Sequence, residues 1–150
     1  MLITKQAQQG AFMPNNSLDY QMYLAQREII KYYNRNLLKQ NQLSYQHYLV
    51  LMVLNEEEVM PVLQLGERLA FQSGTITPIL KKMEARGIIS RHRSEDDERI
   101  VMVQLTEEGM QLVKQLLNTP YDMFKASHLN FEEYQLLMKL SQKIVKNVTY

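Results

Sequence analysis

Three short helical patterns followed at once by two β-rich segments constrain this chain more than any other feature. The helical segments read YQHYLVLMVLNE, VLQLGERLA and SGTITPILKKMEARG, and the last ends at Gly87, a residue type that suits a left-handed helix end. The β-rich segments, Ile88 with Ile89 and then IVMVQL, are separated by the charged run RHRSEDDER. The pattern predicts a three-helix unit that continues into a β-hairpin with a charged tip.

Longer amphipathic segments lie on both sides of this unit. From Ser17 to about Gln40 the apolar residues recur every three or four positions, which predicts one long helix. After the β-rich segments, Thr106 is placed to cap a further helix. Asn130, with Glu133 three positions later, resembles a capping box and predicts a last helix with an apolar stripe. The chain is therefore expected to be mainly α-helical with one small hairpin.

The composition excludes several classes of function. The sequence contains no cysteine, which rules out disulfides, thiolate metal sites and a cysteine nucleophile. His47, His92 and His128 show no metal-ligand spacing, and nothing resembles a nucleotide-binding loop or a catalytic acid–base pair. We expect neither an enzyme nor a cofactor. No apolar run approaches the roughly 18 residues of a membrane span, and the first residues lack a signal peptide's apolar core, so we expect a cytoplasmic protein without membrane contact.

The segment from Ser73 to Gly87 has the polarity of a helix that enters the major groove of DNA. Its predicted buried face consists of Ile76, Ile79, Leu80 and Met83. Its opposite face presents Thr75, Thr77, Pro78, Lys81 and Lys82. Small hydroxyl residues suit base edges, and lysines suit phosphates. With a short helix before it and a hairpin after it, this segment predicts a winged helix-turn-helix.

The charges around this helix are strongly unbalanced. Residues 73–93 hold five cations against one carboxylate, a local balance of +4 in a chain whose net charge is +1. The cations are Lys81, Lys82, Arg86, Arg91 and Arg93, and the carboxylate is Glu84. Such a balance suits a phosphate backbone, although a charged helix and turn also occur as a plain solvated surface. Pro78 disfavours helical geometry at Thr77 and places the helix start near Ser73 to Thr75, where amide groups can bind a phosphate.

The stretch LSYQHYLVLMVLNE, with LGERLAFQSGTITPILKKMEARGIISRHRSEDDERIVMVQLTEEG, resembles the MarR family of regulators and, within it, the OhrR, SarZ and MgrA branch. The resemblance covers about residues 18–110. It implies a homodimer whose first and last helices interlock, with two winged domains on a pseudo-palindromic site in double-stranded DNA. The expected division is a flexible arm (1–16), a dimerisation helix (17–42), a winged helix-turn-helix DNA-binding domain (43–105) and C-terminal dimerisation helices (106–150).

Two motifs of the family are matched residue by residue. The recognition-helix pattern SGTxTPxLK is matched by Ser73, Gly74, Thr75, Thr77, Pro78 and Lys81. The wing pattern D-x-R is matched by Asp97 and Arg99, which implies an arginine in the minor groove and an aspartate that steadies the wing. Outside this context the pair would be interpreted as a surface ion pair that holds a turn. The expected DNA-binding set also includes Lys82, Arg91 and Arg93.

The chain departs from that branch at two positions. Gln72 stands before the recognition helix, where the branch usually has an acidic residue. Asp19 stands where the branch has a reactive cysteine, and Tyr23 and Tyr33 match the tyrosines around that thiol. These three residues are a candidate pocket for a small-molecule effector. The alternative is that the tyrosines are dimer-core residues whose hydroxyls reach a polar partner, a part that Asp19 would suit.

The sequence therefore predicts a sequence-specific transcriptional regulator, and the family favours a repressor. One alternative is a winged-helix protein-interaction module that has lost DNA binding. Lys81, Lys82 and the matched Asp97 and Arg99 argue against that alternative. Another is a ligand-responsive activator.

Overall fold

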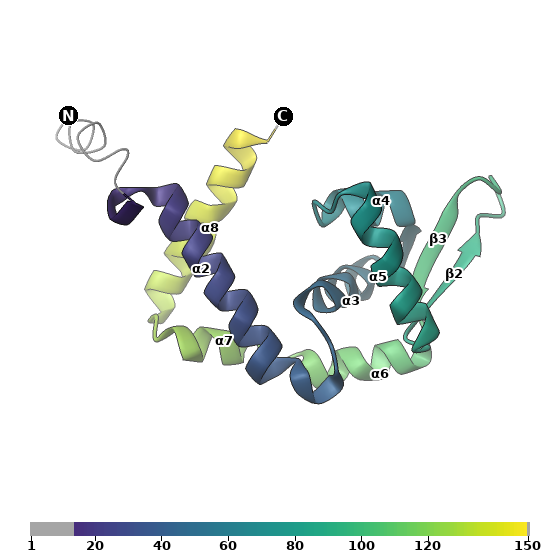
Figure 1. Cartoon of the computed structure of the whole chain (residues 1–150), viewed down its shortest axis with the longest axis horizontal. Coiled ribbons are helices and arrows are strands. Elements are labelled where there is room, and N and C mark those ends of the chain that lie inside the picture. Colours follow the sequence, from purple (N-terminus) through teal and green to yellow (C-terminus); the bar gives the residue numbers. More distant parts are fainter. Residues whose placement is uncertain (1–13, 150) are drawn as a thin grey trace.

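The computed structural model describes residues 14–149, so most of the arm expected at 1–16 lies outside the described residues. The helices are α2 (Leu18–Tyr32), α3 (Tyr45–Glu57), α4 (Val62–Arg68), α5 (Ser73–Ala85), α6 (Glu107–Leu116), α7 (Thr119–Ser127) and α8 (Phe131–Val148). The strands are β1 (Val59–Pro61), β2 (Ile89–Arg93) and β3 (Val101–Leu105). In Figure 1, α2, α7 and α8 occupy one end of the molecule, α3 to α5 with the β2–β3 hairpin occupy the other, and α6 runs between them. The expected mainly helical fold with a hairpin wing is confirmed.

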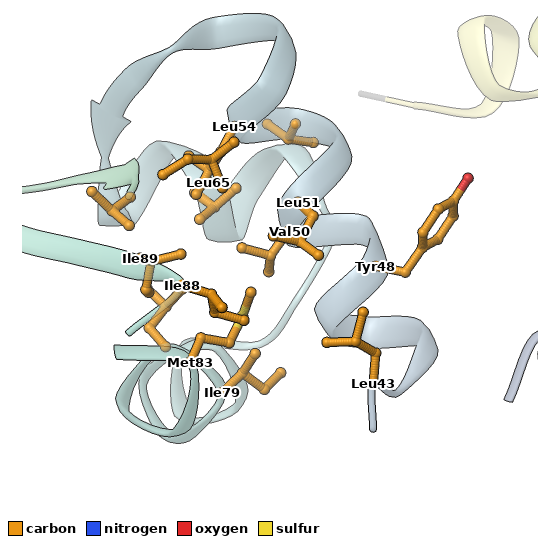
Figure 2. Close-up of a cluster of buried hydrophobic side chains, with 14 of the residues drawn as sticks. Leu43, Tyr48, Val50, Leu51, Leu54, Leu65, Ile79, Met83, Ile88 and Ile89 are labelled. Carbon is orange, nitrogen blue, oxygen red and sulfur yellow. The ribbon is translucent and has the colours of Figure 1, made fainter. Parts of the chain in front are cut away.

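The hydrophobic core lies where α3, α4, α5 and the sheet meet. Side chains that are at most 2% exposed come from all four, namely Val50, Leu51, Leu54, Leu65, Leu80, Met83, Ile89 and Val103, and Leu38 joins them from the segment before α3. Figure 2 shows side chains of α3, α4, α5 and β2 converging in one cluster, from which Tyr48 points away. Gly66 of α4 lies against Ile76 of α5, since a Cβ added there would be 3.5 Å from the isoleucine Cγ2. The two helices of the helix-turn-helix are therefore fixed by direct packing.

The sheet has three antiparallel strands in the order β1-β3-β2. In the hairpin, Ile89 pairs with Leu105 and Arg93 with Val101. The sequence pattern does not predict the third strand, β1. In the structure α3 continues to Glu57, and the chain then turns directly into β1. Three residues ending in a proline are too short for an alternating pattern to be recognised.

The first helix is shorter than the stripe from Ser17 to Gln40 predicted. The α-helix ends at Tyr32 and continues as a π-helical turn over Tyr33–Leu37, followed by a 3-10 turn at Lys39–Asn41. The Leu38 N–H donates to the Tyr33 carbonyl oxygen at 2.8 Å, a bond across five residues. The side chains of Tyr33 and Leu38 are both buried. Two residues five positions apart point to the same side of a helix only where a π-helical turn is inserted between them. Burial thus explains the break in regular helix.

The helices after the wing begin at caps that the sequence identified. The Thr106 hydroxyl accepts from the Gly109 N–H at 3.1 Å, and Asn130 and Glu133 form the expected capping box. A helix that the sequence analysis did not identify, α7, begins between these two helices at Thr119 and Pro120. Proline fits the first turn of a helix, where its missing N–H has no acceptor to satisfy.

Candidate nucleic-acid interface

The recognition helix α5 begins where the sequence placed it, at Ser73. Its first turn is closed by the Thr75 N–H, which donates to the Gln72 carbonyl oxygen at 2.8 Å. Thr77 is helical, so the expected loss of helical geometry before Pro78 is wrong. The proline leaves the carbonyl of Gly74 without its helical N–H, but Gly74 is exposed and water can hydrate that oxygen.

The two faces of α5 are separated as predicted. Ile76, Ile79, Leu80 and Met83 are buried. The exposed residues include Ser73, Gly74, Thr77, Pro78, Lys81 and Lys82, whereas Thr75 is partly buried. Hydroxyl groups therefore lie near the amino end of the exposed face and ammonium groups lie further along it. This order suits a helix whose hydroxyl groups contact base edges and whose ammonium groups contact phosphates.

An ion-pair cluster that sequence reasoning missed fixes α4, the helix that supports α5. Arg68 Nη2 lies 2.8 Å from Glu56 Oε2, and Arg68 Nη1 contacts the carboxylate of Glu57. Both glutamates belong to the last turn of α3. The turn between α4 and α5 is closed by the Phe71 N–H, which donates to the Gly66 carbonyl oxygen at 2.9 Å. Arg68, the last residue of α4, thus ties the carboxyl end of α4 to the last turn of α3.

The five cations of residues 73–93 have different surroundings. Arg91 Nη2 lies 3.0 Å from Glu84 Oε1, and Arg91 Nε donates to Glu84 Oε2 at 3.2 Å. Arg86 donates from both terminal nitrogens to backbone carbonyl oxygens before α3. Within residues 14–149, Lys81 and Lys82 form no ion pair. The balance of +4 therefore includes three arginines that already have partners within the chain, namely Arg86, Arg91 and Arg93.

The wing carries the D-x-R pair in close contact. The Asp97 carboxylate accepts from the Arg99 backbone N–H at 3.0 Å, and its other oxygen lies 2.9 Å from Arg99 Nη2. This contact lowers the pKa of Asp97 below its ordinary value. Arg93 Nη1 donates to the Glu98 carbonyl oxygen at 2.8 Å, which braces the same loop from β2. The Arg99 side chain is nevertheless 90% exposed, so the aspartate shapes the loop while the guanidinium faces solvent.

The three residues of the candidate effector pocket do not meet within one chain. Tyr33 is buried and packs against Tyr45 and Tyr48, with ring centroids 5.1 Å away in each case. Asp19 and Tyr23 are exposed on α2, where Tyr23 accepts from Arg27 Nη1 at 3.2 Å. Fourteen residues separate Asp19 from Tyr33, about 21 Å along a helix.

The hydroxyl of Ser17 hydrogen-bonds the Asp19 carboxylate and lowers its pKa, so this side chain is anionic at neutral pH. Burial raises the pKa of Tyr33, which stays neutral. A pocket of about 280 Å³ does lie beside the tyrosine cluster. Its lining comes from α3, α6 and the start of α7, and includes Tyr48, Met52, Asn55 and Leu116.

Other kinds of site have little support in the described part of the chain. No group of three or more histidine or acidic side chains among residues 14–149 is arranged to hold a metal ion. None of the described helices combines the length and the apolar character required to cross a membrane.

A buried three-helix unit, an exposed cationic recognition helix and a braced hairpin define a winged helix-turn-helix regulator. Residues 31–116 match the family described as transcriptional regulator SarA/Rot. The organic hydroperoxide resistance transcriptional regulator of Bacillus subtilis is 40% identical, covering 85% of this chain and 92% of that protein.

Solved structures agree with this assignment. A structure of reduced AbfR bound to DNA is 28% identical with a TM-score of 0.73, covering 95% of this chain and 99% of that one. A mutant MarR from E. coli complexed with operator DNA shares the fold, with a TM-score of 0.78 at 19% identity, covering 91% and 96% of the two chains. The chain belongs to the SarA/Rot family of transcriptional regulators and has the winged-helix fold of MarR. The relatives and the family are transcriptional regulators, so the protein is a transcriptional regulator and not an enzyme.

Proposed function

We propose that the protein represses transcription as a homodimer that binds a pseudo-palindromic operator. In this proposal each α5 enters the major groove, and each wing places Arg99 in an adjacent minor groove. The observation that carries the proposal is the exposed face of α5, where hydroxyl residues precede Lys81 and Lys82. Repression follows because a dimer that covers two half-sites excludes other proteins from the same stretch of DNA.

The assigned DNA contacts have different tasks. Ser73, Gly74, Thr75, Thr77 and Pro78 approach the bases and the nearest phosphates, and Lys81, Lys82 and Arg93 contact the backbone. Arg91 holds the wing against α5 and does not contact DNA itself, because its guanidinium is paired with Glu84. Asp97 holds the loop from which Arg99 reaches the DNA.

The salt dependence of binding tests these tasks. The logarithm of the affinity should fall linearly with the logarithm of salt concentration. Lys81→Ala should weaken binding to all sequences and reduce the slope by about one, whereas Thr77→Ala should change the preferred sequence. Affinity that does not change between about 50 and 200 mM salt would favour the winged-helix interaction module that has lost DNA binding.

The homodimer is supported by two helices whose residues are at most partly buried in the single chain. Neither α2 nor α8 contains a buried residue, although both have an apolar stripe. Exposed fractions reach 66% at Leu18, 54% at Leu137 and 46% at Leu140. Apolar surface of this extent is rarely left in water, and a second copy provides a complementary surface of the same kind.

Leu140→Glu tests the dimer, and Met110→Glu is the matched control. Met110 is 52% exposed on α6, outside the proposed interface. Leu140→Glu should yield monomer or aggregate in sedimentation and lose binding to a two-half-site operator. Met110→Glu should remain a dimer. A well-folded Leu140→Glu dimer would contradict the proposed interface.

A small-molecule effector belongs to the same proposal. Since Asp19 and Tyr33 are too far apart within one chain, their pocket requires Asp19 of one copy to approach Tyr33 of the other. A ligand there would change the relative position of the two copies, and hence DNA affinity. A ligand that increases transcription in vitro through the same site would instead favour the ligand-responsive activator.

A further inference from the structure

The carboxyl end of the recognition helix is fastened to the segment that arrives from α2. Arg86 caps this end of α5. Its Nη1 donates to the Gln42 carbonyl oxygen at 2.8 Å, and its Nη2 donates to the Asn41 carbonyl oxygen at 2.9 Å. These contacts join residues 44 and 45 positions apart in the sequence.

The segment that receives these bonds is itself held in place. Leu38 and Leu43, at its two ends, are 0% and 5% exposed, and the Leu43 N–H donates to the Leu38 carbonyl oxygen at 3.2 Å. Gln42 adopts a left-handed conformation with φ of 55°. Residues 38–43, called the linker below, therefore have a fixed shape and follow directly on the helix proposed to form the dimer.

Arg86 contributes one of the five cations of residues 73–93, but its geometry favours a task other than contact with the DNA backbone. A planar guanidinium with parallel donors fits two adjacent carbonyl oxygens, whereas an ammonium group cannot hold both in this way. Base contacts in this fold class come from the amino-terminal part of the recognition helix, and Arg86 lies at the opposite end. Its donors are used within the chain.

We infer that Arg86 is a positioning residue that fixes the angle of the recognition helix against the linker and so determines which half-site spacing the dimer accepts. The inference rests on the homodimer proposed above. The thirteen residues of α5 span about 20 Å, so a tilt of about 10° at the Arg86 end moves Ser73 by about 3.4 Å. That displacement equals one base-pair step of DNA.

The first experiment measures affinity as a function of spacing. Operators with fixed half-sites, taken from genomic fragments selected by the protein, are built with the optimal spacing and with one base pair added or removed. Arg86→Ala should lower the ratio of affinities between the optimal and altered spacings by about fivefold or more. Lys82→Ala, which removes an exposed cation one turn earlier, should weaken binding at all spacings by one common factor.

A second variant, Arg86→Lys, separates the charge of Arg86 from its two-point contact, and a folding measurement excludes loss of structure as the cause of weaker binding. Arg86→Lys retains the charge but not the two-point contact, so its spacing ratio should resemble that of Arg86→Ala. Circular dichroism should show each variant folded at the assay temperature. Equal losses at every spacing, as in Lys82→Ala, would make Arg86 a phosphate contact and overturn the inference. Unchanged binding would overturn it as well.

A distance measurement on the free protein provides an independent readout. Because the chain has no cysteine, Ala85→Cys places a single spin label per copy at an exposed position of α5. The distribution of distances between the two labels should be narrow in the parent protein and clearly broader with Arg86→Ala, but not with Lys82→Ala. This width does not depend on DNA contacts.

The outcomes separate the two proposals. If no distance between labels is found because the parent protein is monomeric, the homodimer fails, and the role of Arg86 fails with it. If the parent is a dimer and Arg86→Ala leaves both the width and the spacing ratio unchanged, only the role of Arg86 is overturned.

Discussion

Arg91 on β2 and Glu84 on α5 form a two-point ion pair across the junction of wing and recognition helix. Their atoms approach at 3.0 Å and 3.2 Å, and the pair lowers the pKa of Glu84. The contact joins the element proposed for the major groove to the one proposed for the minor groove. Both grooves can be bound at once only if these two elements keep one relative position.

The first prediction concerns this pair. Glu84→Ala should lower operator affinity about fivefold, because the wing loses its attachment to α5. The same substitution in an Arg99→Ala background should have little further effect, since the wing then lacks the arginine proposed to enter the minor groove. A double-mutant cycle by fluorescence anisotropy measures this coupling. Tighter binding by Glu84→Ala would mean that Arg91 contacts DNA directly and that Glu84 weakens this contact.

The second prediction concerns the tip of the wing. Arg99→Ala should cost about tenfold in affinity at operators flanked by A·T-rich minor grooves, and less at G·C-rich flanks. Its melting temperature should hardly change, because the side chain is 90% exposed. Asp97→Ala should act in the same direction with a smaller effect. If Arg99→Ala unfolds at a much lower temperature while its folded fraction binds normally, the pair is structural only.

Much of the fold was accessible from the sequence because its signals are local. The caps at Thr106 and Asn130, the helix end at Gly87 and the buried face of α5 each depend on residues within one or two turns. Such signals need no knowledge of the tertiary structure.

The parts that the sequence did not provide depend on distant partners. The strand β1 exists because it pairs with β3, and the π turn at Tyr33 exists because Leu38 is also buried. The partners of Arg86 and Arg91 were likewise invisible, since a charge count does not show which cations already have acceptors in the chain.

The third prediction concerns the amino-terminal cap of α3. His47 Nδ1 accepts from the Ser44 N–H at 3.2 Å, which requires neutral imidazole. Burial, with the charges of Arg86 and Lys82, lowers the pKa of His47 below its ordinary 6.5. The unfolded chain therefore takes up the proton first, so this contribution to stability is complete above pH 6.5 and decreases as the pH falls below it. Loss of the cap should lower the melting temperature by about 2–4 °C.

His47→Gln is the control for this effect. A glutamine at this position of a capping box can accept the same bond but does not titrate. Melting curves between pH 7.5 and pH 5 should show a smaller decrease for His47→Gln than for the parent protein. Equal decreases would assign the acid sensitivity to other groups.

The last prediction concerns the chemical signal to which the protein responds. The chain has no cysteine, so it cannot form a sulfenic acid or a mixed disulfide. Low doses of organic hydroperoxide should therefore leave operator binding unchanged. The ten methionines offer a slower route of oxidation, which should need harsher oxidant and should damage packing rather than switch binding reversibly. Rapid, reversible release of DNA by micromolar hydroperoxide would overturn this prediction.

Substitutions at Asp19 test which state of the cysteine-containing branch this protein imitates. Its carboxylate is anionic and exposed in the single chain, and Ser17 holds it at the start of α2. Asp19→Asn removes the charge at nearly constant size, and Asp19→Ser removes it with a smaller side chain. Tighter operator binding by both variants would show that the carboxylate imitates an oxidised sulfur, and weaker binding that it imitates a thiolate. Asp19→Cys should acquire hydroperoxide sensitivity if the tyrosines of a second copy surround this position. If all three variants bind and respond like the parent protein, Asp19 has no part in regulation.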